Sequence, residues 1–169
     1  MEKKSYTLLW GGLGLVLLTI LDQLTKYAAC IFLKDCRSIE VIPEVFEFYY
    51  LENRGAAFGM LRNHQSFFII IAALILAAAF FVYSRIPLQR KYLPLRLVCI
   101  TVSAGALGNM LDRLLHNYVI DFLYFSLIDF PVFNVADCYV CIGILVLLIL
   151  MFTYYKDDSF EFLFHGEKG

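Results

Sequence analysis

Four long apolar stretches divide this 169-residue chain, and they constrain its fold more than any other feature. They cover residues 5–21, 66–84, 97–111 and 138–155. Crossing the hydrocarbon core of a bilayer takes about 20 mostly apolar residues, a length that each stretch reaches once its flanks are included. Hydrophobic residues make up 61% of the chain and charged residues 17%, which is too apolar for a soluble domain. The sequence therefore predicts a membrane protein.

The basic residues indicate how the chain is oriented in the membrane. Those between the second and third stretches are Arg85, Arg90, Lys91 and Arg96, with no acidic residue among them. Lys3 and Lys4 precede the first stretch. Because positive residues near membrane spans stay in the cytoplasm, we expect both termini to be cytoplasmic. Residues 34–65 and 114–136 would then lie on the outer side.

These observations predict an all-α membrane protein, a four-transmembrane-helix bundle that forms a single domain over residues 1–169. The predicted spans are about 6–33, 66–84, 96–113 and 136–155. A small extracytoplasmic β element is expected at about 36–62, because residues 39–42 and 45–51 have strand character and Pro43 separates them.

Charge and cysteine patterns argue against several classes of function. A net charge of −1 and the absence of a Lys/Arg run predict no nucleic-acid binding. Cys138 and Cys141 form a C-x-x-C motif, but the second pair of a zinc site is missing. We interpret the cysteines in the apolar stretches as packing residues. The three histidines are scattered, so we expect no metal and no cofactor.

Polar residues in the first predicted span share one helical face. Thr19, Asp22, Gln23 and Lys26 recur at three- and four-residue steps, and Asp22 and Lys26 are correctly spaced for an ion pair. Two interpretations remain open: the two residues pair only with each other to make insertion tolerable, or they brace a functional site.

The third predicted span carries a second polar stripe. Gly105 and Gly108 permit close approach of a neighbouring helix or a substrate. Asn109 and Arg113 are one turn apart, and an arginine is suited to fixing a carboxylate or a peptide carbonyl. We interpret Asp112 as marking the helix end at the lipid headgroups.

Asp121 and Asp137 are the main candidates for chemistry. Each is expected where a membrane-spanning pattern meets a short polar loop, and charge near lipid is costly enough to indicate a function. With Asn109, Arg113 and Asn134 nearby, they suit a water-activating aspartic protease. Two other classes remain open: a small proton-coupled transporter or channel subunit, and a non-catalytic membrane scaffold.

Ordered sequence blocks resemble those of the lipoprotein signal peptidases, the signal peptidase II family. The blocks are DQLTK at 22–26, ENRGAAFG at 52–59, GALGNMLDR at 105–113, VIDF at 119–122 and FNVAD at 133–137. One departure is Asn117, where glycine is expected before the VIDF block.

The resemblance implies an enzyme with four spans in the bacterial cytoplasmic (inner) membrane and with its site on the outer side, and we expect it to be monomeric. It implies Asp121 and Asp137 as the catalytic dyad. The residues implied to support the dyad are Asn53, Arg113 and Asn134, with Asn109, Asp22 and Lys26 around them. The implied partners are membrane lipid and lipid-modified prolipoproteins, cleaved just before a diacylglyceryl-modified cysteine.

Overall fold

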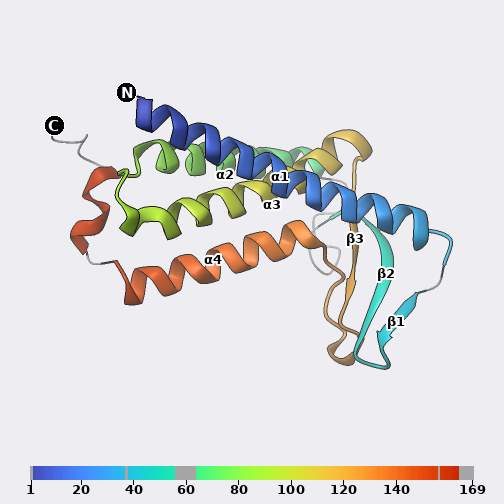
Figure 1. Ribbon diagram of the computed structural model, residues 1–169. Coiled ribbons are helices and arrows are strands. Elements are labelled where there is room, and N and C mark those ends of the chain that lie inside the picture. The colour runs from blue at the N-terminus through green and yellow to red at the C-terminus, as the bar shows by residue number, and fades with distance from the viewer. Residues whose placement is uncertain (1, 37, 56–63, 156, 164–169) are drawn as a thin grey trace.

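The computed structural model describes residues 2–36, 38–55, 64–155 and 157–163. In this part of the chain, four long helices lie along one another, and both ends of the chain lie at the same end of the bundle (Figure 1). The helices are α1 (Glu2–Phe32), α2 (Gln65–Arg85), α3 (Leu93–His116) and α4 (Val135–Thr153). All four are long and apolar enough to cross a membrane. The predicted bundle of four long apolar helices is therefore confirmed.

Three short 3-10 helices are also present in the described part of the chain. They are η2 (Arg90–Tyr92), η3 (Ser126–Ile128) and η4 (Asp157–Leu163). The last one packs against the end of the bundle near the termini, where Tyr92 donates a hydrogen bond to the Ser159 carbonyl at 3.0 Å.

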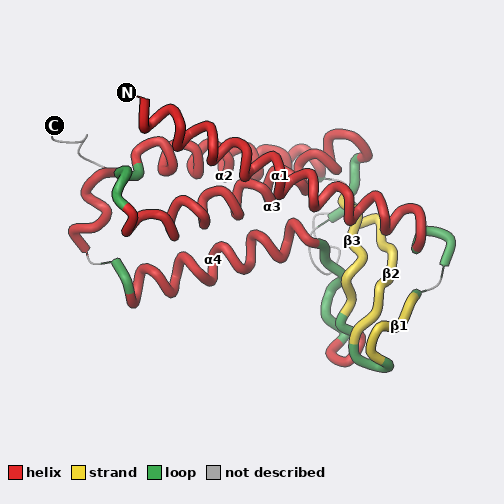
Figure 2. The backbone as a smooth tube through the Cα atoms, viewed as in Figure 1, coloured by secondary structure: helices red, strands yellow, loops and turns green. Residues whose placement is uncertain are grey.

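A three-stranded antiparallel sheet lies at the opposite end of the bundle (Figure 2). Its strands are β1 (Ile39–Ile42), β2 (Phe46–Asn53) and β3 (Val119–Tyr124), in that order across the sheet. The first two confirm the expected β element, whose remaining residues 56–62 lie outside the described residues, as does part of the ENRGAAFG block. The third strand was not predicted: Asp121 lies within β3, paired with Leu51, and not in a loop.

The turn between α3 and β3 explains the departure at Asn117. Its φ is 63°, in the left-handed region, and its backbone N–H donates to the Arg113 carbonyl at 3.1 Å to end the helix. Glycine adopts this conformation most easily, and asparagine is among the few other residues that adopt it readily. The substitution therefore preserves the helix end.

Helix α3 is the centre of the bundle, because it packs against α1, α2 and α4. Close approach depends on its glycines: a Cβ at Gly105 would collide with the Ala136 carbonyl and the Val140 side chain. The outer faces of the helices carry exposed apolar side chains such as Leu9, Ile70 and Phe152, as lipid contact requires. Polar side chains are instead concentrated inside.

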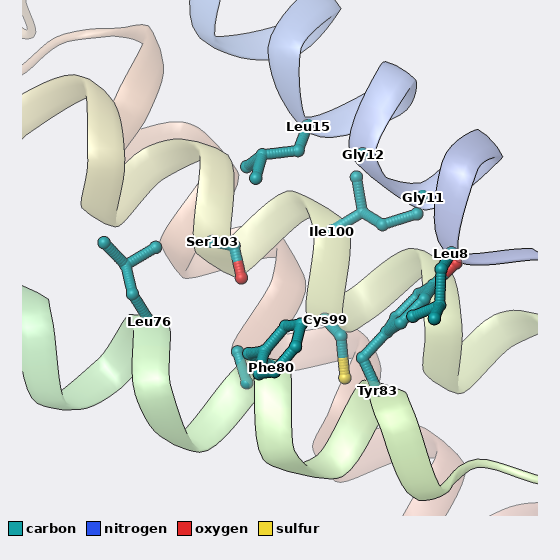
Figure 3. Close-up of a pocket in the computed structure, with 11 residues that line it drawn as sticks. Leu8, Gly11, Gly12, Leu15, Leu76, Phe80, Tyr83, Cys99, Ile100 and Ser103 are labelled. Atoms are coloured by element: carbon teal, nitrogen blue, oxygen red, sulfur yellow. The ribbon is translucent and has the colours of Figure 1, made fainter. Parts of the chain in front are cut away.

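An apolar cavity of about 430 Å³ lies between α1, α2 and α3, in the half of the bundle nearer the N-terminus. Leu15, Phe80 and Ile100 line it from the three helices (Figure 3). A second cavity at the sheet end has a different lining, which includes both candidate aspartates.

Candidate active site

Asp121 is buried on β3 between two asparagine amides. Asn134 Nδ2 donates to one carboxylate oxygen at 2.6 Å, and Asn53 Nδ2 donates to the other at 2.8 Å. Asn53 Oδ1 accepts from the Gly55 backbone N–H at 3.0 Å, so its amide nitrogen is the end that faces Asp121. Asp121 is thus held at both oxygens in a fixed orientation.

Asp137 lies in the first turn of α4, where it forms a capping box with Asn134. The Asp137 backbone N–H donates to Asn134 Oδ1 at 3.0 Å, and the Asn134 backbone N–H donates to Asp137 Oδ2 at 3.1 Å. Such reciprocal bonds satisfy otherwise unpaired donors at a helix start. Because the same Asn134 also donates to Asp121, one asparagine connects both carboxylates.

Both aspartates line a cavity of about 490 Å³, which we call the site cavity. Polar residues in its lining include Asn53, Asn109 and Arg113, all of which were predicted as site residues. Asn134 contacts the dyad directly, as described above. The apolar part of the wall comes from the segment before α4, from α4 and from β3, and it includes Phe130, Pro131, Val132, Phe133, Ile142 and Val119.

The environment of Asp121 favours its protonated form. Burial, followed by the nearby charge of Asp137, raises its pKa from 3.8 to about 7, against the opposing effect of the hydrogen bonds from Asn53 and Asn134. Near neutral pH, this site can therefore hold a proton that an ordinary aspartate would have lost. That property suits a pair of carboxylates that shares one proton.

A buried lysine orients the amide beside Asp137. Lys26 Nζ lies 3.0 Å from Asp22 Oδ2 and 3.0 Å from Asp112 Oδ2, and it donates to Asn109 Oδ1 at 2.8 Å. With its oxygen so occupied, Asn109 directs its Nδ2 to Asp137 Oδ1 at 2.8 Å. Of the two interpretations left open by the sequence, these contacts favour bracing of the site over isolated pairing.

The interpretation of Asp112 as a residue that only marks the end of the helix was wrong. Asp112 is fully buried inside the bundle, and it accepts hydrogen bonds from Gln23 Nε2 at 2.9 Å and from the Ile120 backbone N–H at 3.1 Å. The second bond fixes β3 at the residue before Asp121. Its place in the polar stripe of α3, four residues after Gly108, was the signal that could have identified it.

Asp22 supports the other aspartate through the backbone. Its Oδ1 accepts from the Ala136 N–H at 2.9 Å, at the residue before Asp137. Gly108 makes this approach possible, because a Cβ there would collide with Asp22 Oδ2. The α1 carboxylate thus reaches the start of α4 across the surface of α3.

Arg113 lines the site cavity, and not all of its N–H donors are used in hydrogen bonds among the described residues. Its guanidinium lies over the Phe68 ring, 4.7 Å from the centroid, and Nη1 donates to the Asn109 carbonyl at 3.2 Å. Its Nε is buried and has no hydrogen-bond partner among the described residues. Within the described residues, Arg113 forms no ion pair with either aspartate, so it remains available to a bound ligand.

Two cysteines also line the site cavity, although the sequence indicated packing roles for them. They are Cys138, which is half-buried, and Cys141, which is exposed.

Among the described residues, no group of three or more histidine, cysteine, aspartate or glutamate side chains is arranged to hold a metal ion.

Comparison with known proteins points to one family. The family model for signal peptidase (SPase) II matches residues 15–153. The lipoprotein signal peptidase of Brevibacillus brevis is 40% identical over 144 residues, covering 85% of this chain and 95% of the relative. That of Caldanaerobacter subterraneus is 42% identical over 132 residues, covering 78% and 88%.

Solved structures of bacterial membrane enzymes share the fold of this chain. A bacterial membrane enzyme determined by the in meso method at 2.3 Å resolution superposes with a TM-score of 0.75 at 33% identity, covering 87% of this chain and 92% of that one. A second such structure, at 1.9 Å resolution, has a TM-score of 0.73 at 33% identity, with coverage of 86% and 94%.

Proposed function

The chain belongs to the signal peptidase II family and is a multi-pass membrane peptidase, and from this premise we propose that it cleaves by an aspartic mechanism. The observation that carries the proposal is that Asp121 and Asp137 share Asn134 as a hydrogen-bond partner and line one cavity. Membership of a peptidase family sets aside the transporter and scaffold interpretations.

In the proposed mechanism, one carboxylate is ionised and the other is protonated. The ionised aspartate takes a proton from a water molecule as that water attacks the scissile carbonyl carbon. The protonated aspartate donates a hydrogen bond to the carbonyl oxygen as negative charge develops there. The raised pKa of Asp121 supports this division, because it allows the pair to keep one proton near neutral pH.

The asparagines and Arg113 have separate proposed tasks. Asn53, Asn109 and Asn134 hold the carboxylate oxygens in place, so little reorganisation is needed when the water attacks. Arg113 lines the cavity and forms no ion pair with either aspartate among the described residues, which suits its guanidinium to hold a carbonyl oxygen of the substrate backbone.

The proposed substrate is a bacterial prolipoprotein, cut just before its diacylglyceryl-modified cysteine. Acyl chains are held in the bilayer by about 0.8 kcal/mol per buried CH₂ group, so the lipid would fix the depth of the scissile bond. The dyad lies where the helix bundle meets the sheet, and with both termini cytoplasmic this junction is at the outer boundary of the bacterial cytoplasmic membrane.

The direct test uses purified protein and a synthetic peptide that carries a signal helix and a diacylglyceryl cysteine. Mass spectrometry should find two fragments, with the modified cysteine at the new N-terminus. The same peptide without the lipid is the control and should be cut far more slowly. An intact lipidated peptide, or a cut at another bond, would contradict the proposal.

Topology can be tested separately with intact bacteria. A membrane-impermeant thiol reagent should label Cys36, which is exposed in the segment between α1 and β1, from outside the cell. Labelling only after the membrane is permeabilised would place the sheet in the cytoplasm and contradict the proposed orientation.

A further inference from the structure

Two thiols from α4 lie in the same cavity as the dyad. Cys138 directly follows Asp137, and Cys141 lies one helical turn beyond Asp137. Both line the site cavity, and neither is fully buried. A substituent on either sulfur would therefore extend into the space that a peptide must enter to reach the carboxylates.

The other three cysteines are placed differently. Cys30 is half-buried, with its sulfur 3.9 Å from the Tyr50 hydroxyl, and Cys99 is buried beside the separate apolar cavity. Cys36 is exposed outside the bundle. Of the five cysteines, only Cys138 and Cys141 share a cavity with the dyad.

The walls of the site cavity determine which reagents reach these thiols. Phe130, Val132 and Ile142 give one side an apolar lining, and the helix that carries Ile142 is long and apolar enough to cross a membrane. A small apolar reagent can partition into such a site, whereas a large charged one is excluded by the cost of desolvation. Access should therefore favour apolar electrophiles.

We propose that Cys138 and Cys141 form a covalent-modification site, at which an apolar thiol-reactive electrophile closes the site cavity. The inhibition rests on the proposed function, whereas the modification itself does not. With a maleimide, the thiolate sulfur adds to one alkene carbon. A sulfur–carbon bond forms, the carbon–carbon π bond breaks, and the proton lost by the thiol is balanced by one gained at the neighbouring carbon.

The test treats the purified protein with N-ethylmaleimide and follows two readouts, the adduct mass on each cysteine and the rate of lipopeptide cleavage. The proteins compared are the unchanged chain, C36S, C138S, C141S and the double variant C138S/C141S. Each rate is divided by the rate of the same protein without reagent, so any direct effect of a substitution cancels.

We expect the unchanged chain and C36S to lose activity in proportion to the fraction modified at Cys138 or Cys141. The double variant should keep its activity while Cys36 is still modified. Excess lipopeptide should slow the adduct at Cys138 and Cys141 but not at Cys36.

Three results would overturn the inference: no adduct on either cysteine, an adduct without loss of rate, or equal inhibition of the double variant. If the untreated protein cleaves no lipopeptide, the proposed function fails instead. Slower modification of Cys138 and Cys141 in the presence of lipopeptide would then still support a ligand-accessible modification site, and unchanged modification would overturn it.

Discussion

Lys26 Nζ lies 2.8 Å from Asn109 Oδ1, and this hydrogen bond connects a buried ion cluster to the amide that contacts Asp137. The same ammonium pairs with Asp22 and Asp112, which hold the backbones of Ala136 and Ile120. One buried cation from α1 therefore helps to position both members of the dyad.

Replacing Lys26 with methionine should destabilise the protein strongly. K26M leaves the carboxylates of Asp22 and Asp112 buried without their cation, and removing one partner of a buried pair costs about 3–5 kcal/mol. Thermal unfolding in detergent measures the loss. K34M is the matched control, since the Lys34–Glu52 pair lies at the surface, where ion pairs contribute little to stability. Equal melting temperatures for K26M and K34M would contradict this account.

Activity should fall as the pH rises through about 7. Above the raised pKa of Asp121, at about 7, the pair loses the proton that the catalytic acid needs. The pH profile of kcat/KM measures this effect. A rate that keeps rising well above the pKa of about 7 would show that no proton near Asp121 is required.

The same raised pKa predicts a change in stability. Between pH 3.8, the ordinary pKa, and about 7, the folded state holds a proton that the unfolded state has released, so the free energy of unfolding decreases as pH rises through this window. D121N lacks this dependence. The melting temperature of the unchanged protein, relative to D121N, should therefore fall with rising pH, and a constant difference would contradict the pKa shift.

Two glycines should respond differently to alanine. A Cβ at Gly108 would collide with Asp22 and lie 3.4 Å from the Ala136 Cβ, whereas a Cβ at Gly12 meets nothing within 4 Å. Overpacking typically costs about 1–3 kcal/mol, so G108A should lower both the melting temperature and the rate. G12A should be neutral or slightly stabilising, because alanine favours helix by about 1 kcal/mol. A G108A variant as stable as G12A would show that Asp22 moves freely.

The helices could be predicted because apolar stretches of spanning length have few alternatives in a bilayer. Strands β1 and β2 were recognisable from their β-prone residues and from Pro43 between them. Strand β3 was not, because its first four residues are all buried and show no alternation of polar and apolar side chains. Its partner β2 also lies far away in the sequence, so only the folded chain reveals the pairing.

The candidate site was predicted as a set of residues but not as a network. Its position in the polar stripe of α3 marked Asp112 as a candidate, but its role was missed because that role depends on Gln23 from α1 and on the Ile120 backbone from β3. Asn134 was predicted to support the dyad, but only the folded chain shows that its side-chain amide contacts both aspartates. Cys138 and Cys141 fit a packing pattern, and only the cavity shows that they border the dyad.

The central claim is that Asp121 and Asp137 together activate water, and isosteric substitution of each tests it most directly. D121N and D137N should each abolish cleavage of the lipidated peptide while remaining folded in the membrane, because an amide can neither accept the proton from water nor supply the acid proton. D129N is the matched control, since Asp129 is exposed and bonds only Tyr124 among the described side chains. Cleavage by D129N alone is the predicted result, and substantial turnover by either D121N or D137N would contradict the claim.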